Sequence, residues 1–207
     1  INDALKLGAD SNYGYDYKKD FEDRYVLRAR NPVTTGWERV DDICKGGLGS
    51  GELGVVIAPT GAGKSMVLVH LGAQAVKSGL NVIHYTLELC HTTIGQRYDS
   101  CLTGVHLKDL FSLKEQIYEK VKDIEGNVII KEYPTKSAST TTIRSHLDKL
   151  KQQGVPIDMI IVDYGDLLKP VSAPRGSEKR HDLESIYEEL RAIAQIFECP
   201  VWTASQT

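Results

Sequence analysis

Five short apolar runs recur along the chain, separated by longer segments in which apolar residues have helical spacing. The runs predict strands at residues 53–57, 81–87, 127–130, 157–163 and 200–204. In the fourth run nearly every residue is apolar, which is typical of a strand buried on both faces of a parallel sheet. The alternation of strands and helices predicts an α/β fold, a mainly parallel twisted sheet with helices on both faces.

Apolar residues three or four positions apart predict the helices that separate these strands. Helices are expected at about residues 66–78, 91–102, 107–124, 141–152 and 183–197, with a short helical turn at 37–43. The third helix is expected to present one apolar face, made by Leu107, Leu110, Phe111, Ile117, Val121 and Ile124. In the fourth, the inward side chains are expected to be Ile143, Leu147 and Leu150.

The first 36 residues differ from the rest, because they are polar and carry a cluster of tyrosines. A helix is predicted from about residue 17 to 30, since Tyr17, Phe21 and Tyr25 recur every four positions along one face. An aromatic stripe outside the core needs a cover, which is either its own domain or a neighbouring subunit. We therefore expect a linker segment with this helix at 1–36, followed by a core domain at 37–207.

The composition is that of an ordinary soluble protein, with 41% hydrophobic and 26% charged residues. Because the formal net charge is −3, any nucleic-acid site must be a local basic patch. There is neither an apolar run of about 18 residues nor a signal peptide, so we expect a cytoplasmic protein without a membrane span. The spacing of the four cysteines matches no standard zinc site, which favours free thiols.

Residues 58–65 carry the clearest chemical signal in the chain. Their sequence is Ala58-Pro59-Thr60-Gly61-Ala62-Gly63-Lys64-Ser65, between a predicted strand and a predicted helix. This is the context of a P-loop, in which backbone N–H groups and the helix N-terminus hold the phosphates of a nucleotide. Lys64 would reach the outer phosphates of ATP and the Ser65 hydroxyl would hold Mg²⁺. Ala58 stands where the full pattern has glycine, a departure that we expect to be mild.

Polar residues follow three other strands, at the edge of the sheet where ligands of open α/β folds bind. Glu88 follows the second strand, Asp163 ends the fourth and Gln206 follows the fifth. We expect Asp163 to orient Mg²⁺, Glu88 to act as general base toward water, and Gln206 to sense the terminal phosphate. The alternatives are an ordinary strand-end carboxylate for Asp163 and a helix N-terminal carboxylate for Glu88.

The loop at 169–181 concentrates positive charge, in the side chains of Lys169, Arg175, Lys179 and Arg180. Single-stranded nucleic acids are bound largely through their phosphates, so this loop is a candidate DNA contact. A solvated loop with no ligand explains the same residues, and both interpretations stay open.

The order of these motifs resembles that of the DnaB-type hexameric replicative helicases, which have a RecA-like ATPase core. Residues 35–53 and the P-loop are similar to the beginning of that core. Thr86-Leu87-Glu88 resembles the catalytic-glutamate motif, Ile161-Val162-Asp163-Tyr164 the Walker B motif, and residues 202–206 the motif that ends in glutamine. Residues 14–17, 129–135 and 188–194 look like the replicative helicases of T-even-type bacteriophages.

The resemblance implies a RecA-like P-loop NTPase that hydrolyses ATP at the subunit interfaces of a hexameric ring. It also implies movement along single-stranded DNA, duplex unwinding, and primase and a helicase loader as partners, in the host cytoplasm if the protein is viral. The family's arginine finger and much of its DNA-contacting region would lie beyond Thr207, so the core is expected to be truncated at its C-terminal end. A recombinase and a DNA-independent regulatory ATPase remain alternatives.

Overall fold

The computed structural model describes residues 14–25, 30–171 and 179–206. The chain divides into two compact units, Ile1–Arg30 and Asn31–Thr207, so the larger unit begins at residue 31 where we expected 37. Among the described residues, no helix is both long enough and apolar enough to cross a membrane.

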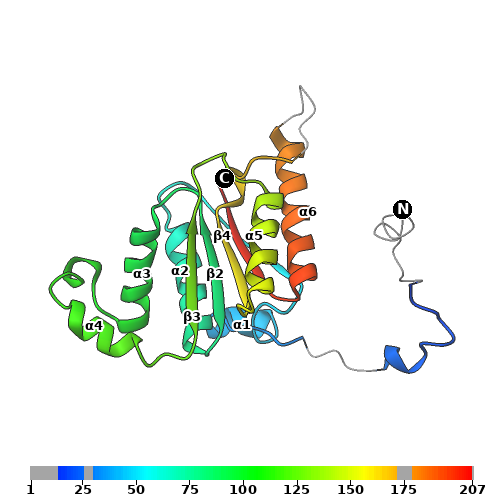
Figure 1. Cartoon of the computed structure of the whole chain (residues 1–207), viewed down its shortest axis with the longest axis horizontal. Coiled ribbons are helices and arrows are strands. Elements are labelled where there is room, and N and C mark those ends of the chain that lie inside the picture. The colour runs from blue at the N-terminus through cyan, green and yellow to red at the C-terminus, as the bar shows by residue number, and fades with distance from the viewer. Residues whose placement is uncertain (1–13, 26–29, 172–178, 207) are drawn as a thin grey trace. The chain divides into compact units, whose positions relative to one another are not determined.

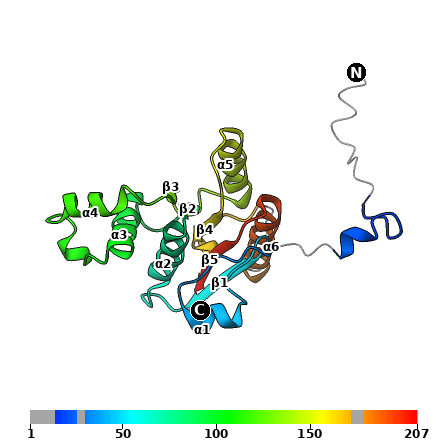
Figure 2. The ribbon, with the colours of Figure 1, turned by 90° about the horizontal axis from the view of Figure 1, so that it is seen from below.

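The larger unit is built on one sheet of five strands, all of them parallel to their neighbours. The strands are β1 (Leu53–Ala58), β2 (Asn81–Thr86), β3 (Asn127–Glu132), β4 (Met159–Asp163) and β5 (Val201–Gln206). Their order across the sheet is β1-β5-β4-β2-β3; β2, β3 and β4 are labelled in Figure 1 and all five strands in Figure 2. The prediction of a parallel α/β sheet is therefore confirmed, and β4 lies at its centre.

Helices cover both faces of this sheet. On one face lie α2 (Lys64–Lys77) and α3 (His91–Thr103), and on the other α5 (Thr140–Gln152) and α6 (Lys179–Phe197) (Figure 1, Figure 2). Two shorter helices are α1 (Glu38–Ile43) and α4 (Lys114–Val121), and three-residue 3₁₀ helices are η2 (Glu22–Arg24), η3 (Leu107–Asp109) and η4 (Gly165–Leu167). The predicted turn at 37–43 and the helices near 66–78, 91–102, 141–152 and 183–197 are confirmed.

The core consists of two layers because successive strand residues point to opposite faces of the sheet. Val82 of β2 packs with Leu71 of α2 in one layer, whereas Ile83 packs with Leu147 of α5 in the other. As expected for α5, the side chains of Ile143 and Leu147 are fully buried and Leu150 is nearly so.

The single helix predicted at 107–124 is wrong in its first half. This part forms η3 and turns, and α4 begins only at Lys114. Phe111, expected on the apolar face, is 85% exposed, whereas Leu110 and Ile117 are buried. Gly104 ends α3 in the left-handed conformation, so the chain must reverse within a few residues. Short 3₁₀ pieces serve such connections better than a long α-helix.

The α-helix predicted at 17–30 does not form over residues 17–25, and residues 26–29 lie outside the described ranges. The Asp16 carboxylate accepts the backbone N–H groups of Lys18 and Lys19 and holds a turn, which η2 follows. The Arg24 guanidinium lies 4.1 Å from the centre of the Tyr17 ring. A helix this short is marginal without tertiary packing, which explains why periodicity alone gave the wrong prediction. Docking of this segment on a neighbouring subunit stays a prediction.

Candidate functional site

The P-loop connects β1 to α2, as the sequence predicts. Gly61 and Gly63 have φ angles of +78° and +94°, in the left-handed region that favours glycine. Ala58 is the last residue of β1 and needs no such conformation, so alanine replaces the glycine of the full pattern without backbone strain. Gly63 is the N-cap of α2, which directs the N-terminus of this helix toward the loop.

Lys64 is folded back onto the loop that precedes it. Its side chain is 9% exposed, and its Nζ donates to the carbonyl oxygens of Ala58 at 3.0 Å and Pro59 at 3.1 Å. The ammonium also lies 5.5 Å from the centre of the Tyr164 ring. Two loop carbonyls therefore hold the Lys64 ammonium in this structure. In a nucleotide complex, phosphate oxygens would replace these carbonyls as its acceptors.

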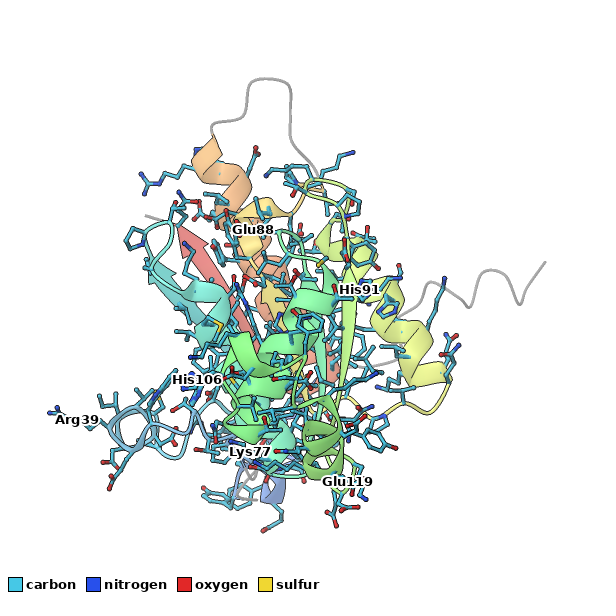
Figure 3. All side chains as sticks on the ribbon, turned by 90° about the vertical axis from the view of Figure 1, so that its left-hand side faces the viewer. Arg39, Lys77, Glu88, His91, His106 and Glu119 are labelled. Atoms are coloured by element: carbon cyan, nitrogen blue, oxygen red, sulfur yellow. The ribbon has the colours of Figure 1, made fainter. Side chains whose placement is uncertain are left out.

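A cavity of about 220 Å³ lies above the carboxyl ends of the strands. It is lined by the P-loop, the start of α2, the middle of α3, the bend after β2, the residue after β4 and the end of β5. The lining residues are Thr60, Gly61, Gly63, Lys64, Ser65, Met66, Glu88, Leu89, Arg97, Tyr164 and Gln206. Figure 3 shows Glu88 at this end of the sheet, whereas Lys77 and Glu119 lie toward the opposite end. The fold thus brings Lys64, Ser65, Glu88 and Gln206 together, while Ala58, Pro59 and Ala62 belong to the loop without lining the cavity.

Asp163 lies at the end of β4 with a fully buried side chain. Within the described ranges, neither of its carboxylate oxygens has a hydrogen-bond partner of normal geometry. Burial is the main cause that raises the pKa of this carboxyl to about 6; nearby Ser65 lowers it, Glu88 raises it, and Arg97 and Lys64 lower it. A buried carboxylate without hydrogen bonds is costly unless a cation compensates it. With the Ser65 hydroxyl beside it, this donor set fits Mg²⁺.

The unpaired carboxylate leads to a prediction on stability. We expect Asp163→Asn to raise the free energy of unfolding of the ligand-free protein near neutral pH by roughly 1–2 kcal/mol. Raising the pKa of this carboxyl from 3.8 to about 6 corresponds to roughly 3 kcal/mol, and the buried amide keeps part of the desolvation cost. Urea unfolding of both proteins across a pH series measures this difference.

The sign of the pH dependence follows from the raised pKa of Asp163. The pKa of this carboxyl is 3.8 in the unfolded chain and about 6 in the folded protein. Below pH 3.8 the protonated carboxyl therefore contributes its full stabilisation of the folded state, and this contribution is lost as the pH rises through about 6. The advantage of Asp163→Asn should therefore shrink toward pH 4. An asparagine variant that is no more stable than the parent near neutral pH would contradict an uncompensated charge.

Glu88 is exposed at the tip of a tight bend after β2. The Thr86 hydroxyl closes this bend, since it donates to the carbonyl of Leu89 at 2.7 Å and accepts from the N–H of Leu89 at 3.2 Å. The N–H of Leu87 donates to the carbonyl of Asp163 at 2.9 Å, which ties the bend to β4. Hydrogen bonds therefore fix the backbone on either side of Glu88, while Glu88 itself lines the cavity.

Gln206 ends β5, which is separated from β2 by β4, and its backbone N–H is held by a hydrogen bond. Its N–H donates to Oδ2 of Asp166 at 3.0 Å, and its Oε1 accepts from the Tyr164 hydroxyl at 3.4 Å. Oδ1 of Asp166 accepts a 2.5 Å hydrogen bond from the hydroxyl of Tyr187 on α6. The end of β5 is thus connected to α6 through one carboxylate.

Two polar residues that line the cavity, Arg97 and Tyr164, were not predicted from the pattern of polar positions. Arg97 lies on α3, lines the cavity, and lowers the pKa of Asp163 by its charge. Tyr164 lies between Lys64 and Gln206, and only the family resemblance singled it out in the sequence. An arginine within a helix normally faces solvent, so the sequence offered no signal for Arg97.

The predicted basic loop lies partly outside the described residues, which leave out Arg175. Lys169 is exposed and its N–H donates to the carbonyl of Ala138 at 2.8 Å. Lys179 begins α6, and Arg180 follows it with an exposed side chain. Neither Lys169 nor Arg180 lines the cavity, so a role in binding DNA stays a prediction.

Comparison with known proteins places this geometry in a family. The model of the DnaB-like helicase C terminal domain matches residues 32–207. The chain is 34% identical over 221 residues to the DnaB-like replicative helicase of Enterobacteria phage T4, covering 100% of this chain and 46% of that protein. It is 24% identical to the replicative DNA helicase DnaB of Mycoplasma genitalium, covering 84% of this chain and 38% of that protein. The chain thus spans less than half the length of these relatives.

Solved structures share the fold. A DnaB-like replicative helicase, studied with its interactions with primase, superposes with a TM-score of 0.71 at 14% identity, over 99% of this chain and 51% of that chain. A second solved structure, an ATPase domain, superposes with a TM-score of 0.70 at 15% identity, over 100% of this chain and 70% of that chain. These likenesses establish the fold of the core.

Proposed function

Because this chain belongs to the family of DnaB-like helicase C-terminal domains, we propose that it is the ATP-hydrolysing motor of a replicative DNA helicase. The observation that carries the proposal is the convergence of the P-loop, Glu88 and Gln206 on one cavity, above the buried, unpaired carboxylate of Asp163. Phosphoryl transfer to water needs groups that hold phosphates, position a cation and activate the water. This cavity offers one group for each task.

In the proposed mechanism the P-loop residues, 58–65, bind and orient the phosphates of ATP. Lys64 exchanges its loop carbonyls for outer phosphate oxygens, and Ser65 and Asp163 would hold Mg²⁺. Bound between them, the cation would supply positive charge that offsets the charge developing on the phosphate oxygens. Glu88 accepts a proton from the attacking water as general base. We propose that Gln206 senses the terminal phosphate. Its hydrogen bond to Asp166, which also accepts from Tyr187 of α6, would transmit the change on hydrolysis to that helix.

We also propose the assembly and partners that the family suggests. The chain would act in a homo-oligomer, a hexameric ring, that encloses single-stranded DNA and unwinds duplex from 5′ to 3′. One solved relative was studied with primase, which supports a primase contact in the complete protein. A helicase loader is a further expected partner.

The experiment that tests this function is ATP hydrolysis by the full-length protein, with and without single-stranded DNA, followed by a strand-displacement assay. We expect Mg²⁺-dependent hydrolysis that DNA stimulates, and displacement of a strand. Hydrolysis without displacement, with filaments rather than rings in electron micrographs, would point to a recombinase. Hydrolysis that DNA does not change would point to a regulatory ATPase.

The basic residues after Lys169 give a separate prediction. We expect joint replacement of Arg175, Lys179 and Arg180 by alanine to weaken binding of single-stranded DNA and to reduce the slope of log affinity against log salt by about two, because each phosphate contact contributes roughly 0.7. Fluorescence anisotropy across a salt series measures both quantities. A matched control replaces three exposed lysines elsewhere, Lys108, Lys114 and Lys149. If the salt slope of the first variant is unchanged, these residues do not contact DNA phosphates and the segment is an ordinary solvated loop.

A further inference from the structure

The loop between β3 and α5, residues 133–139, packs against the bend that carries Glu88. The N–H of Tyr133 donates to the carbonyl of Thr86 at 3.0 Å. The hydroxyl of Thr135 donates to the carbonyl of Leu87 at 2.7 Å. Leu87 immediately precedes Glu88, so the Thr135 hydroxyl is bonded to the peptide group that carries the candidate base.

The other side of the same loop is bonded to η4 and the residue after it. The N–H of Lys136 donates to the carbonyl of Leu167 at 3.1 Å, and its Nζ donates to the carbonyls of Asp166 at 2.8 Å and Leu168 at 3.1 Å. Lys136 has a φ of +59°, which is unusual for a residue with a side chain. Three hydrogen bonds from one lysine stabilise this uncommon conformation.

The segment that Lys136 holds is also the segment that holds Gln206. The Asp166 carboxylate accepts the N–H of Gln206 and the hydroxyls of Ser205 and Tyr187. The 133–139 loop is therefore bonded on one side to the backbone of Glu88 and on the other to the support of Gln206. None of its own residues lines the cavity.

We propose that Thr135 and Lys136 are positioning residues, which fix the positions of the general base Glu88 and the phosphate sensor Gln206 relative to each other. This inference rests on the proposed function of the cavity. Thr135 sets the orientation of the peptide between Leu87 and Glu88, and through it the place of the Glu88 carboxylate. Lys136 fixes the position of η4 through its hydrogen bonds to the carbonyls of Asp166 and Leu168. Because the Asp166 carboxylate accepts the N–H of Gln206, the position of η4 also fixes that of Gln206. Small displacements of a catalytic group are costly, since the reacting atoms must be aligned within fractions of an ångström.

The test compares Thr135→Val, which removes the hydroxyl at nearly constant volume, with Thr135→Ser, which keeps it. We expect Thr135→Val to lower kcat for ATP about tenfold or more, with KM and nucleotide affinity changed less than about twofold, because binding groups are untouched. Thr135→Ser should restore kcat to within about threefold of the parent. The matched control is Thr141→Val, at an exposed threonine in the first turn of α5.

A purely structural role for Thr135 predicts different results. It would lower the melting temperature and the active fraction, and so leave kcat per bound nucleotide unchanged. A Thr135→Val protein with unchanged kcat, or a Thr135→Ser protein that is no better, would overturn the inference. If the parent protein itself does not hydrolyse ATP, the proposed function fails instead, and the two failures are thereby distinguished.

Double variants test whether Thr135 acts through Glu88 and Lys136 through Gln206. Single-turnover hydrolysis by Thr135→Val combined with Glu88→Gln should equal that of Glu88→Gln alone, because Thr135 acts only through Glu88. Lys136→Met should likewise lower kcat on its own and add nothing to Gln206→Ala. Losses that multiply in either pair would mean that the loop acts independently of these two side chains, which would contradict the proposal.

Discussion

Replacement of Lys64 by alanine is expected to abolish useful nucleotide binding, with a loss of affinity of about 100-fold or more. A hydrogen bond to a charged group contributes roughly 1.5–3 kcal/mol, and the ammonium of Lys64 would make two of them to the outer phosphates. The side chain is nearly buried at the base of the cavity, where its charge is poorly screened. Titration with a fluorescent ATP analogue, or calorimetry, measures the change in dissociation constant.

The matched control for this variant is Lys77→Ala, at the other end of the same helix. The Nζ of Lys77 donates to the carbonyl of Cys101 and lies far from the cavity (Figure 3). We expect its nucleotide affinity to equal that of the parent. Since Lys64→Ala also removes two hydrogen bonds to loop carbonyls, its melting temperature is measured alongside. A folded Lys64→Ala protein that binds ATP within about threefold of the parent would exclude the proposed phosphate site.

The second large effect is expected at Glu88. Glu88→Gln should keep nucleotide affinity and lower kcat by about 10²–10⁴-fold, since general-base catalysis typically contributes that much. The change is nearly isosteric and the side chain is exposed, so we expect the fold to be unaffected. Phosphate release under single-turnover conditions, together with the dissociation constant for ATP, separates loss of chemistry from loss of binding.

The control for Glu88→Gln is Glu119→Gln, which removes the same charge from α4 at the opposite end of the sheet (Figure 3). Its kcat should be that of the parent. Normal turnover in Glu88→Gln would mean that another group activates the water. In that case Asp163, whose pKa is raised by burial to about 6, becomes the residue to examine next.

Much of the fold followed from local patterns. All five strands were predicted, because a run of apolar residues between helical segments is a local property of a buried parallel strand. Two helix predictions, at residues 107–124 and 17–30, were wrong for the same physical reason. The periodicity of Leu107 to Ile124 and of Tyr17 to Tyr25 is compatible with a helix, but helix formation in short segments depends on packing that the pattern does not encode.

The sequence by itself identified the P-loop and the strand-end residues Glu88, Asp163 and Gln206 as the candidate site. These signals are local, since a glycine loop before a helix, or a polar residue after an apolar run, is complete within about ten residues. The membership of a helicase family was visible for the same reason, through short motifs in a fixed order.

Only the tertiary structure decided how these residues meet. The strand order places β4 between β5 and β2, so Asp163 lies buried between Gln206 and Glu88, although 75 residues separate it from Glu88 and 43 from Gln206 in the chain. Burial without partners, which raises the pKa of Asp163, is a property of that packing. The contacts of Arg97, Thr135 and Lys136 likewise join residues far apart in sequence, because their partners are brought near by the sheet and not by the local pattern.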